Sequence, residues 1–247
     1  MKSKSTVMVR RNLKHIARNP TTVFNAVLMP IVVMLMFVYV FGDAFSVGVD
    51  YVDYATPGLL LLAVCYGLGS VAVSVNSDAT KGIINRFKVM DVPRSAVLTG
   101  HVVASVLTNL LAVAALIGVA FLLGFSPSAG FLDWLGVVGL VVLLSFAAGW
   151  LTIAMGLSAK SPETAGLASL PLVMLPFFSS AISPTDKMGP GVRQFAEYQP
   201  FTPIIETLRG LLNGAPAAGD VIPALAWCVG IALVGYLWAN STFTKRA

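Results

Sequence analysis

The stretch "FNAVLMPIVVMLMFVYVFG", residues 24–42, contains no charged residue and decides the fold class of this chain. It lies in an uncharged run between Arg18 and Asp43, long enough for a helix of about 20 residues that crosses a hydrocarbon core of about 30 Å. A secretory signal is the alternative, but its apolar part has only about 7–15 residues and a small-residue cleavage site follows it. This run is longer and continues into "DAFSVG", so we expect a retained membrane span.

The rest of the chain repeats this pattern. Hydrophobic residues make up 57% of the 247 residues and the mean hydropathy is +0.84, whereas soluble domains contain roughly 45–50% apolar residues. Since a bilayer leaves backbone groups no water to bond, long apolar segments cross it as helices. We therefore expect an all-α membrane protein, a single domain over residues 1–247 with six transmembrane helices. The expected spans are 22–42, 54–77, 99–124, 134–158, 164–184 and 221–242.

Lysine and arginine are distributed unevenly between the two sides of this arrangement. With six spans both termini share a side, and that side holds 13 of the 16 basic residues but only three of the 11 acidic ones. Because cytoplasmic loops carry an excess of Lys and Arg, we expect both termini to be cytoplasmic. The net charge of +5 follows from this topology and does not indicate a nucleic-acid partner.

Two cytoplasmic segments have the pattern of amphipathic helices. Residues 5–19, "STVMVRRNLKHIARN", place apolar side chains at helical spacing beside Arg10, Arg11 and Lys14, which is typical of a helix on the membrane surface. These charges either fix topology and bind anionic lipid or also contact a cytoplasmic partner. The loop 78–94 likewise carries an apolar stripe, and we favour docking of this stripe in a groove of another protein over membrane contact.

Two prolines, Pro171 and Pro176, fall within the expected fifth span. Each removes a backbone donor and breaks or kinks a helix, which a membrane tolerates only where protein or a wet cavity covers the freed carbonyls. We therefore expect this span to face the bundle interior or a partner chain.

The segment 185–214 is too polar for a span and too apolar for an ordinary loop. Thr202 as N-cap, Pro203 as the first helical residue and Gly214 as the stop predict a helix of about 11 residues, or about 16 Å, which is half a membrane. We expect an amphipathic half-helix that enters the outer leaflet.

Glu206 and Arg209 lie three positions apart on the polar face of this half-helix. An unpaired charge at membrane depth is costly, so both should have fixed partners. They form either a local structural pair or a gate on the route of a substrate, and the sequence leaves both interpretations open.

Three stretches resemble the permease subunits of type-2 ATP-binding-cassette (ABC) exporters, especially the daunorubicin-type branch that exports drugs and antibiotics. They are "ARNPTTVFNAVLMPIVVMLMFVYVFG" (17–42), "KGIINRFKVMDVPRSAVLTGH" (81–101) and "QPFTPIIETLRGLLNG" (199–214). The resemblance implies six helices, an interfacial N-terminal helix, re-entrant helices between the fifth and sixth spans, and a bacterial or archaeal cytoplasmic membrane.

The resemblance also assigns roles to residues. It implies ATPase coupling by Lys81, Gly82, Arg86, Phe87, Pro93 and Arg94, and an outer re-entrant or gate region with Pro203, Glu206, Arg209 and Gly214. Lys81 departs from the pattern, because relatives commonly have an acidic residue before the glycine of this loop. The implied partners are two ABC ATPase subunits and a second copy of this chain or a paralogue.

No G-x-x-x-x-G-K-[ST] motif occurs in the chain, so we expect ATP and Mg²⁺ to bind the partner subunit and no cofactor to bind here. No catalytic residue or metal site is expected, since Cys65 and Cys228 lie within apolar runs and His15 and His101 are far apart. Residues that could line a substrate path are Phe24, Tyr39, Phe177, Phe178 and Phe201.

The sequence favours an exporter of a hydrophobic drug, antibiotic or lipid-like molecule, with a glycan or glycolipid as the alternative substrate. An ion-coupled secondary transporter is disfavoured, because such proteins place charged residues within their spans and these spans have none. An intramembrane enzyme would need a nucleophile and base at membrane depth, and His101 has no evident partner. A simple membrane anchor would explain neither the apolar cytoplasmic loop nor the broken fifth span.

Overall fold

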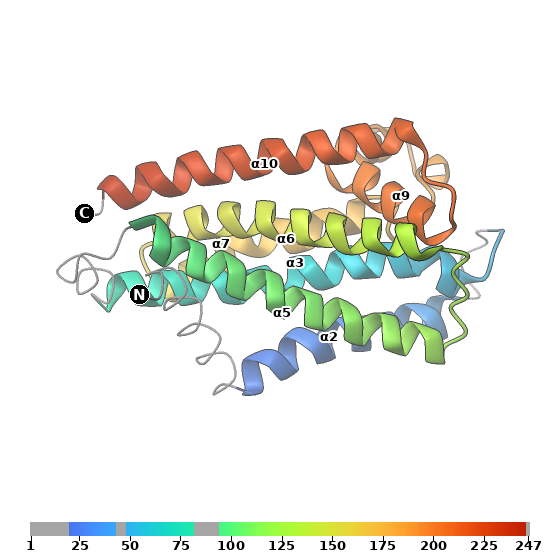
Figure 1. Cartoon of the computed structure of the whole chain (residues 1–247), viewed down its shortest axis with the longest axis horizontal. Helices are drawn as coiled ribbons and strands as arrows, with labels where there is room; N and C mark the ends of the chain where they lie inside the picture. Colours follow the sequence, from blue (N-terminus) through green and yellow to red (C-terminus); the bar gives the residue numbers. More distant parts are fainter. Residues whose placement is uncertain (1–19, 43–47, 82–93, 246–247) are drawn as a thin grey trace.

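The computed structural model describes residues 20–42, 48–81 and 94–245, and every regular element in these ranges is a helix (Figure 1). In chain order they are α2 (Pro20–Phe41), α3 (Tyr51–Thr80), α5 (Arg94–Leu122), α6 (Phe131–Ser158), α7 (Pro162–Met174), the 3₁₀ turns η2 (Leu175–Phe178) and η3 (Thr185–Lys187), α8 (Val192–Tyr198), α9 (Phe201–Leu212) and α10 (Ala218–Lys245). The expected surface helix 5–19 lies outside the described residues.

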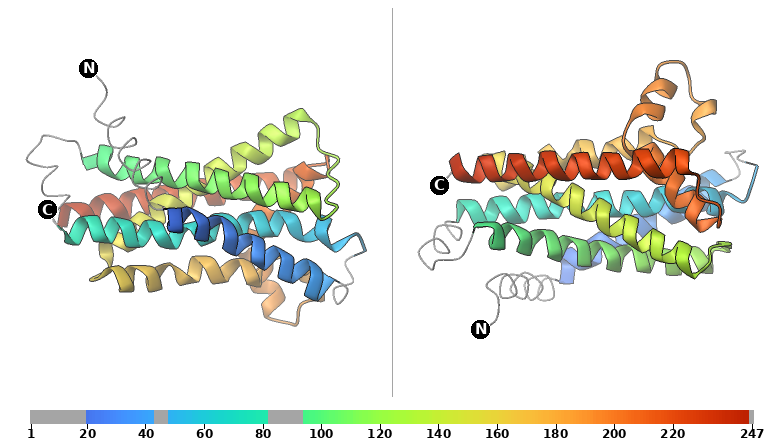
Figure 2. Two further views of the ribbon diagram at one scale, coloured as in Figure 1. Left: turned by 90° about the horizontal axis from the view of Figure 1, so that it is seen from below. Right: turned by 45° about the horizontal axis from the view of Figure 1, so that its top comes forward.

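The long helices run side by side, and α3 lies at the centre of the bundle (Figures 1 and 2). It packs against α2, α5, α6, α7 and α9, and 67% of its most apolar stretch of 18 residues is buried inside the structure. Helix α10 lies at the edge of the bundle and packs against α6 and α9. Only 17% of its most apolar stretch of 18 residues is buried. An apolar face left exposed in this way is expected of a helix in contact with lipid.

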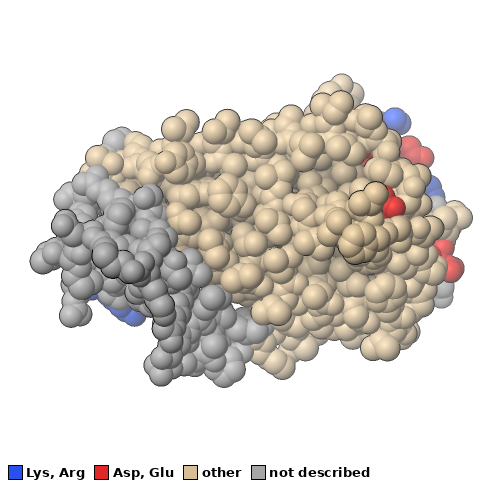
Figure 3. Space-filling model, viewed as in Figure 1, with Lys and Arg blue, Asp and Glu red and all other residues tan. Residues whose placement is uncertain are grey.

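The bundle has two ends, which we name by what lies there. At the α9 end, α2 stops, α3, α6 and α10 begin, and α9 packs across them; at the Lys81 end, α3 and α6 stop and α5 begins (Figure 1). On the face shown in Figure 3, the charged atoms lie towards the two ends and the middle is uncharged. This distribution fits a molecule whose middle is surrounded by hydrocarbon.

Four helices among the described residues are long and apolar enough to cross a membrane: Tyr51–Thr80, Leu98–Leu122, Phe131–Ser158 and Ala218–Thr244. They coincide with the expected second, third, fourth and sixth spans. The expected first span falls on α2, a helix of 22 residues whose apolar part, Ala26–Val40, is shorter than these four.

The segment expected as the fifth span does not form one continuous helix. Helix α7 begins with a Ser161–Thr164 capping box and contains 13 residues, after which the chain tightens into η2 at Leu175. Pro176 lies at the start of η2, where it has no N–H to continue the α-helical ladder. The predicted break is found at Pro176, whereas Pro171 lies inside α7 and does not end it, and the α-helix ends ten residues before the expected boundary at 184.

Close backbone contacts hold the bundle together at glycines. A Cβ added to Gly156 of α6 would lie 2.6 Å from the Ala72 carbonyl oxygen of α3, and one on Gly235 of α10 would lie 2.5 Å from the Leu151 nitrogen of α6. Van der Waals packing is a main source of helix association in lipid, where small residues let backbones approach.

The buried side chains form two clusters. The larger one includes α9 and extends through the α9 end and the middle of the bundle, and it contains the free cysteines Cys65 and Cys228. The smaller one joins α3, α5, α6 and α10 near the Lys81 end, and its buried members are Val71, Val75, Leu98, Val102, Trp150, Ile153, Ala154, Leu157, Ala239 and Phe243. Neither α2 nor α7 supplies a described residue to this second cluster.

Candidate functional site

Helix α9 packs an apolar face against the bundle, and a glycine follows its last residues. Ile204, Ile205, Leu208 and Leu212 are at most 1% exposed, which confirms the predicted apolar face. The helix ends at Leu212, and Gly214 follows with a φ of 66°, a left-handed conformation that glycine adopts without strain. The predicted stop at Gly214 is confirmed.

The predicted N-cap at Thr202 and the predicted first helical residue at Pro203 are both wrong. Helix α9 begins at Phe201, so Thr202 and Pro203 both lie within its first turn, and Pro200 occupies the cap position. The Thr202 hydroxyl donates instead to the carbonyl oxygen of Ala196 in α8, 2.5 Å away, and accepts from the Ser180 N–H at 3.4 Å. The Thr202 side chain therefore does not cap its own helix. It links α9 to α8 and to the segment after η2.

Arg209 is the centre of a polar cluster at the α9 end. Its Nη1 donates to Glu206 Oε1 at 2.5 Å, and its Nη2 donates to the carbonyl oxygens of Tyr54 at 3.2 Å and Ser180 at 2.9 Å. Its Cζ lies 4.0 Å from the centre of the Tyr54 ring. The arginine side chain is 14% exposed and its Nε is buried without a hydrogen-bond partner, so the guanidinium is largely removed from water.

The same cluster ties the start of α3 to the chain that follows η2. The Tyr54 hydroxyl donates to the Ser180 carbonyl oxygen at 3.0 Å, and the Tyr51 hydroxyl donates to that of Ile182 at 3.3 Å. A Cβ on Gly58 would lie only 2.4 Å from Cα of Ala181, so α3 and this segment are in backbone contact. Three segments distant in sequence are therefore fastened together here.

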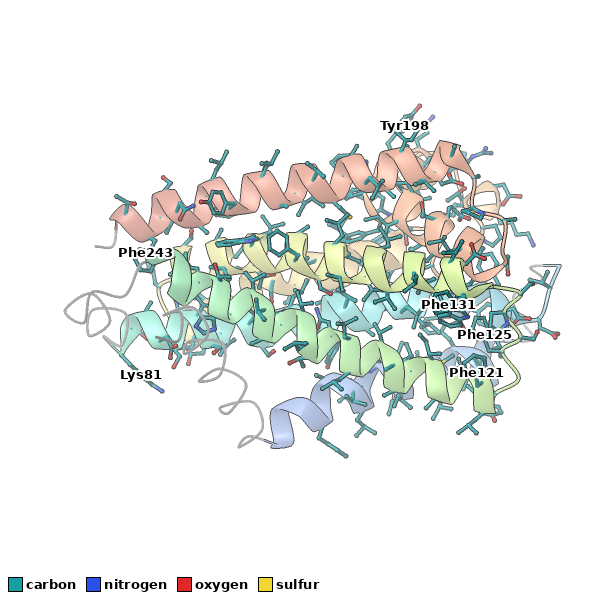
Figure 4. The ribbon with its side chains drawn as sticks, in the orientation of Figure 1. Lys81, Phe121, Phe125, Phe131, Tyr198 and Phe243 are labelled. Atoms are coloured by element: carbon teal, nitrogen blue, oxygen red, sulfur yellow. The ribbon has the colours of Figure 1, made fainter. Side chains whose placement is uncertain are left out.

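The segment between η2 and α9, residues 179–200, contains a second ion pair. Arg193 Nε donates to Glu197 Oε1 at 2.7 Å, with side chains 50% and 38% exposed, and this hydrogen bond raises the pKa of the Arg193 guanidinium. The Gln199 amide donates to the carbonyl oxygen of Phe178. Tyr198 lies in the same segment, is exposed, and is labelled next to α10 in Figure 4.

One face of α3 remains exposed although the helix is central. Tyr66, Ser70 and Val73 lie at helical spacing and are exposed, with Tyr66 at 40%. Val73 and the neighbouring Gly69 approach Gly166 and Ser169 of α7, and α3 also packs against α2. This face, which we name the α3 strip, carries two hydroxyl groups and no charge.

Four of the five residues predicted for a substrate path are exposed on α2 and η2, which both pack against α3. They are Phe24 and Tyr39 on α2 and Phe177 and Phe178 on η2. Near the α9 end the two elements meet, since the rings of Phe37 and Phe177 have centroids 6.5 Å apart. Phe201 lies elsewhere, 3% exposed in the larger core.

The residues predicted for ATPase coupling are only partly within the described chain. Lys81 is the C-cap of α3 and is exposed, and it points away from the bundle in Figure 4. Arg94 is the first residue of α5. Gly82, Arg86, Phe87 and Pro93 lie outside the described residues, as do Arg10, Arg11 and Lys14 of the expected surface helix.

The sequence interpretation missed two polar contacts at the Lys81 end. His101 Nε2 lies 3.4 Å from Asp78 Oδ2, although His101 was expected to lack a partner. Asn76 Nδ2 donates to the carbonyl oxygens of Gly156 at 2.8 Å and Ala159 at 2.7 Å, at the end of α6. No spacing rule reveals these contacts, because each joins side chains and carbonyls on different helices. In the described part of the chain, no three His, Cys, Asp or Glu side chains come close enough to hold a metal ion.

The family model described as "ABC-2 type transporter" matches residues 4–213. The chain belongs to the ABC-2 type transporter family. It is therefore a multi-pass membrane protein of a family of permease subunits that work with an ABC ATPase.

Two curated members of the family are similar over most of the chain. The "daunorubicin resistance ABC transporter permease protein DrrB1" of Streptomyces coeruleorubidus is 30% identical over 217 residues, which are 87% of this chain and 76% of that protein. The "probable doxorubicin resistance ABC transporter permease protein DrrC" of Mycobacterium tuberculosis is 26% identical over 235 residues, which are 94% and 85% of the two chains.

Proposed function

We propose that this chain is the membrane-spanning subunit of an ATP-driven exporter that moves a hydrophobic drug, antibiotic or lipid-like molecule out of the cell. The observation that carries the proposal is the match to the ABC-2 family over residues 4–213. The two similar permeases are named for resistance to daunorubicin and doxorubicin, which are flat aromatic molecules of the class that an uncharged, aromatic path would suit. The chain itself has no phosphate-binding loop, so the partner ATPase holds ATP and Mg²⁺.

In this proposal α2 and the segment of α7, η2 and residues 179–184 are the first and fifth of six spans. The α9 end faces outward, residues 185–214 form the re-entrant segment, and both termini lie in the cytoplasm of a bacterium or archaeon. The excess of basic residues on the terminal side supports this orientation.

The substrate path follows the α3 strip between α2 and α7. At the α9 end this route is narrowed by Phe37 and Phe177 and fastened by the Arg209 cluster, whereas the strip itself is exposed from Tyr66 to Val73 towards the Lys81 end. The described conformation is thus the one expected before export, with the outer side closed. A second permease subunit, a copy or a paralogue, would complete the path across the exposed faces of α2 and α7.

ATP binding would close two partner ATPase subunits and push on the coupling loop 78–94. This motion changes the angle between the two permease subunits and opens the α9 end. The Arg209 cluster would then be an outer fastening that has to loosen in each cycle, which explains why it is built from several hydrogen bonds rather than from apolar packing alone.

Two experiments test the proposal. Purification of the chain from its native membrane in mild detergent, followed by mass spectrometry, should recover an ABC ATPase at about one copy per permease chain. Reversal of charge in the coupling loop, Arg86→Glu with Arg94→Glu, should then separate ATP hydrolysis from export while the chain remains inserted. Absence of a nucleotide-binding partner after crosslinking, or unchanged export by the double variant, would contradict the proposal.

A further inference from the structure

A buried contact between ionisable side chains lies at the Lys81 end. Asp78 Oδ2 and His101 Nε2 are 3.4 Å apart, and the two side chains are 16% and 8% exposed. Asp78 belongs to the last turn of α3, which ends at Thr80, and His101 to the second turn of α5, which begins at Arg94. The contact therefore joins the two helices from which the coupling loop leaves and to which it returns.

The contact therefore lies between the two ends of the coupling loop, where α3 ends and α5 begins. A pair that is largely out of water is screened less by salt than an exposed pair. Removal of one partner is therefore more destabilising than it would be at the surface. An imidazole with a proton on Nε2 can donate to the carboxylate whether the ring is charged or neutral. The contact is therefore available in both protonation states of His101.

The helices joined by this contact belong to one packed unit. Leu98 and Val102, on either side of His101 in α5, lie in the second core with Val75 of α3 and Ile153 of α6. Asn76, two residues before Asp78, donates to two carbonyls at the end of α6. Among the described residues, the buried members of this core all come from α3, α5, α6 and α10, so these four helices are packed together at the Lys81 end.

We propose that Asp78 and His101 are positioning residues that fasten the base of the coupling loop to this unit. Through their contact, a push of the ATPase on residues 82–93 moves α3 and α5 together. Without it the loop shifts on its own, and ATP is hydrolysed without a matching movement of the path. This inference rests on the proposed function, because it assigns the loop to ATPase coupling.

The test compares export with ATP hydrolysis in vesicles that contain the complete permease and ATPase complex. Asp78→Ala and His101→Ala should lower the amount of doxorubicin exported per ATP hydrolysed by about fivefold or more, as expected when a contact between two interacting residues is lost. ATPase copurification and ATP hydrolysis should be retained. Asp78→Asn, which keeps the volume and one acceptor oxygen, should show a smaller loss.

A matched control and a rescue separate positioning from general stability. Asp53→Ala removes a carboxylate from the opposite end of α3, where Asp53 accepts bonds from the Ser126 N–H at 2.9 Å and hydroxyl at 3.2 Å, and should leave the ratio unchanged. Exchange of the two residues, Asp78→His with His101→Asp, should restore most of the ratio.

The proposal is overturned if the two alanine variants export at the wild-type ratio, or if the exchange variant stays as poor as the alanine variants. A wild-type complex that exports without ATP would instead reject the proposed function, and this inference with it.

Discussion

Arg209 of α9 lies over the ring of Tyr54 at the start of α3, with its Cζ 4.0 Å from the ring centre. The same guanidinium donates to the carbonyl oxygens of Tyr54 and Ser180, so it binds backbone as well as an aromatic face. A cation over a ring contributes about 0.5–1 kcal/mol when exposed and about 2 kcal/mol when desolvated. Arg209 is 14% exposed and thus belongs nearer to the desolvated case.

Replacement of Arg209 should destabilise the protein. Arg209→Ala removes three hydrogen bonds, to Glu206 and to the carbonyl oxygens of Tyr54 and Ser180, of which the Ser180 oxygen keeps the Tyr54 hydroxyl as a donor. Each hydrogen bond to a charged group is worth about 1.5–3 kcal/mol, so we expect a loss of at least about 2 kcal/mol in the free energy of unfolding. Arg209→Lys should recover only part, because one ammonium cannot reproduce the planar fork. Thermal unfolding of the purified protein measures the loss. Arg193→Ala, which removes an exposed pair with Glu197, is the control and should leave the melting temperature nearly unchanged.

The close approach of α3 to the chain after η2 predicts a steric effect at Gly58. A Cβ there would meet the Ala181 backbone at 2.4 Å, so Gly58→Val should cost about 1–3 kcal/mol by overpacking and should disturb the Tyr54 and Ser180 contact. Gly118→Ala on α5 has nothing within 4 Å of its added Cβ and should be neutral or slightly stabilising. Equal melting temperatures for the two variants would show that the backbones are not in contact.

The α3 strip predicts a residue that affects substrate handling without affecting the fold. On the proposed path along the α3 strip, with doxorubicin as the probe, Tyr66→Ala should lower the apparent affinity by about tenfold, because a large half-exposed side chain is removed. Its matched control is Leu237→Ala on α10, where the side chain is 65% exposed on the edge of the bundle. An equal loss of apparent affinity in Tyr66→Ala and Leu237→Ala would contradict a substrate path along α3.

The buried cysteines allow a direct test of orientation. Cys65 and Cys228 are both 0% exposed, so a membrane-impermeant maleimide should not label the native chain. Ala217→Cys and Lys160→Cys introduce exposed thiols at the α9 end and the Lys81 end, respectively. We expect labelling of Ala217→Cys in intact cells and of Lys160→Cys only after the membrane is permeabilised. The reverse pattern would invert the topology.

The sequence predicted most of the fold because its signal is simple. Uncharged runs mark the expected spans, and a helix is the structure that satisfies their backbone in lipid. Pro176 also predicted the break after α7, whereas α7 continues through Pro171. How far the α-helix extends was not predictable, since the chain after Pro176 follows the contacts that Tyr51 and Tyr54 of α3 make with it.

The candidate site was predictable only where its partners are close in sequence. Glu206 and Arg209 form the expected pair at i, i+3, but Arg209 binds Tyr54 and Ser180 more than 25 positions away. Thr202 illustrates the same limit, because its side chain met an acceptor in α8 instead of the start of its own helix. Asp78 and His101 pair across the coupling loop, and no local pattern announces a contact of that kind.

The most direct test of the account is ATP-dependent uptake of doxorubicin by inside-out membrane vesicles that contain the chain and its copurified ATPase. The account predicts that uptake requires hydrolysable ATP, persists when the proton gradient is dissipated, and stops with a non-hydrolysable analogue. Uptake that ignores ATP and collapses with the proton gradient would contradict it and identify a secondary transporter instead.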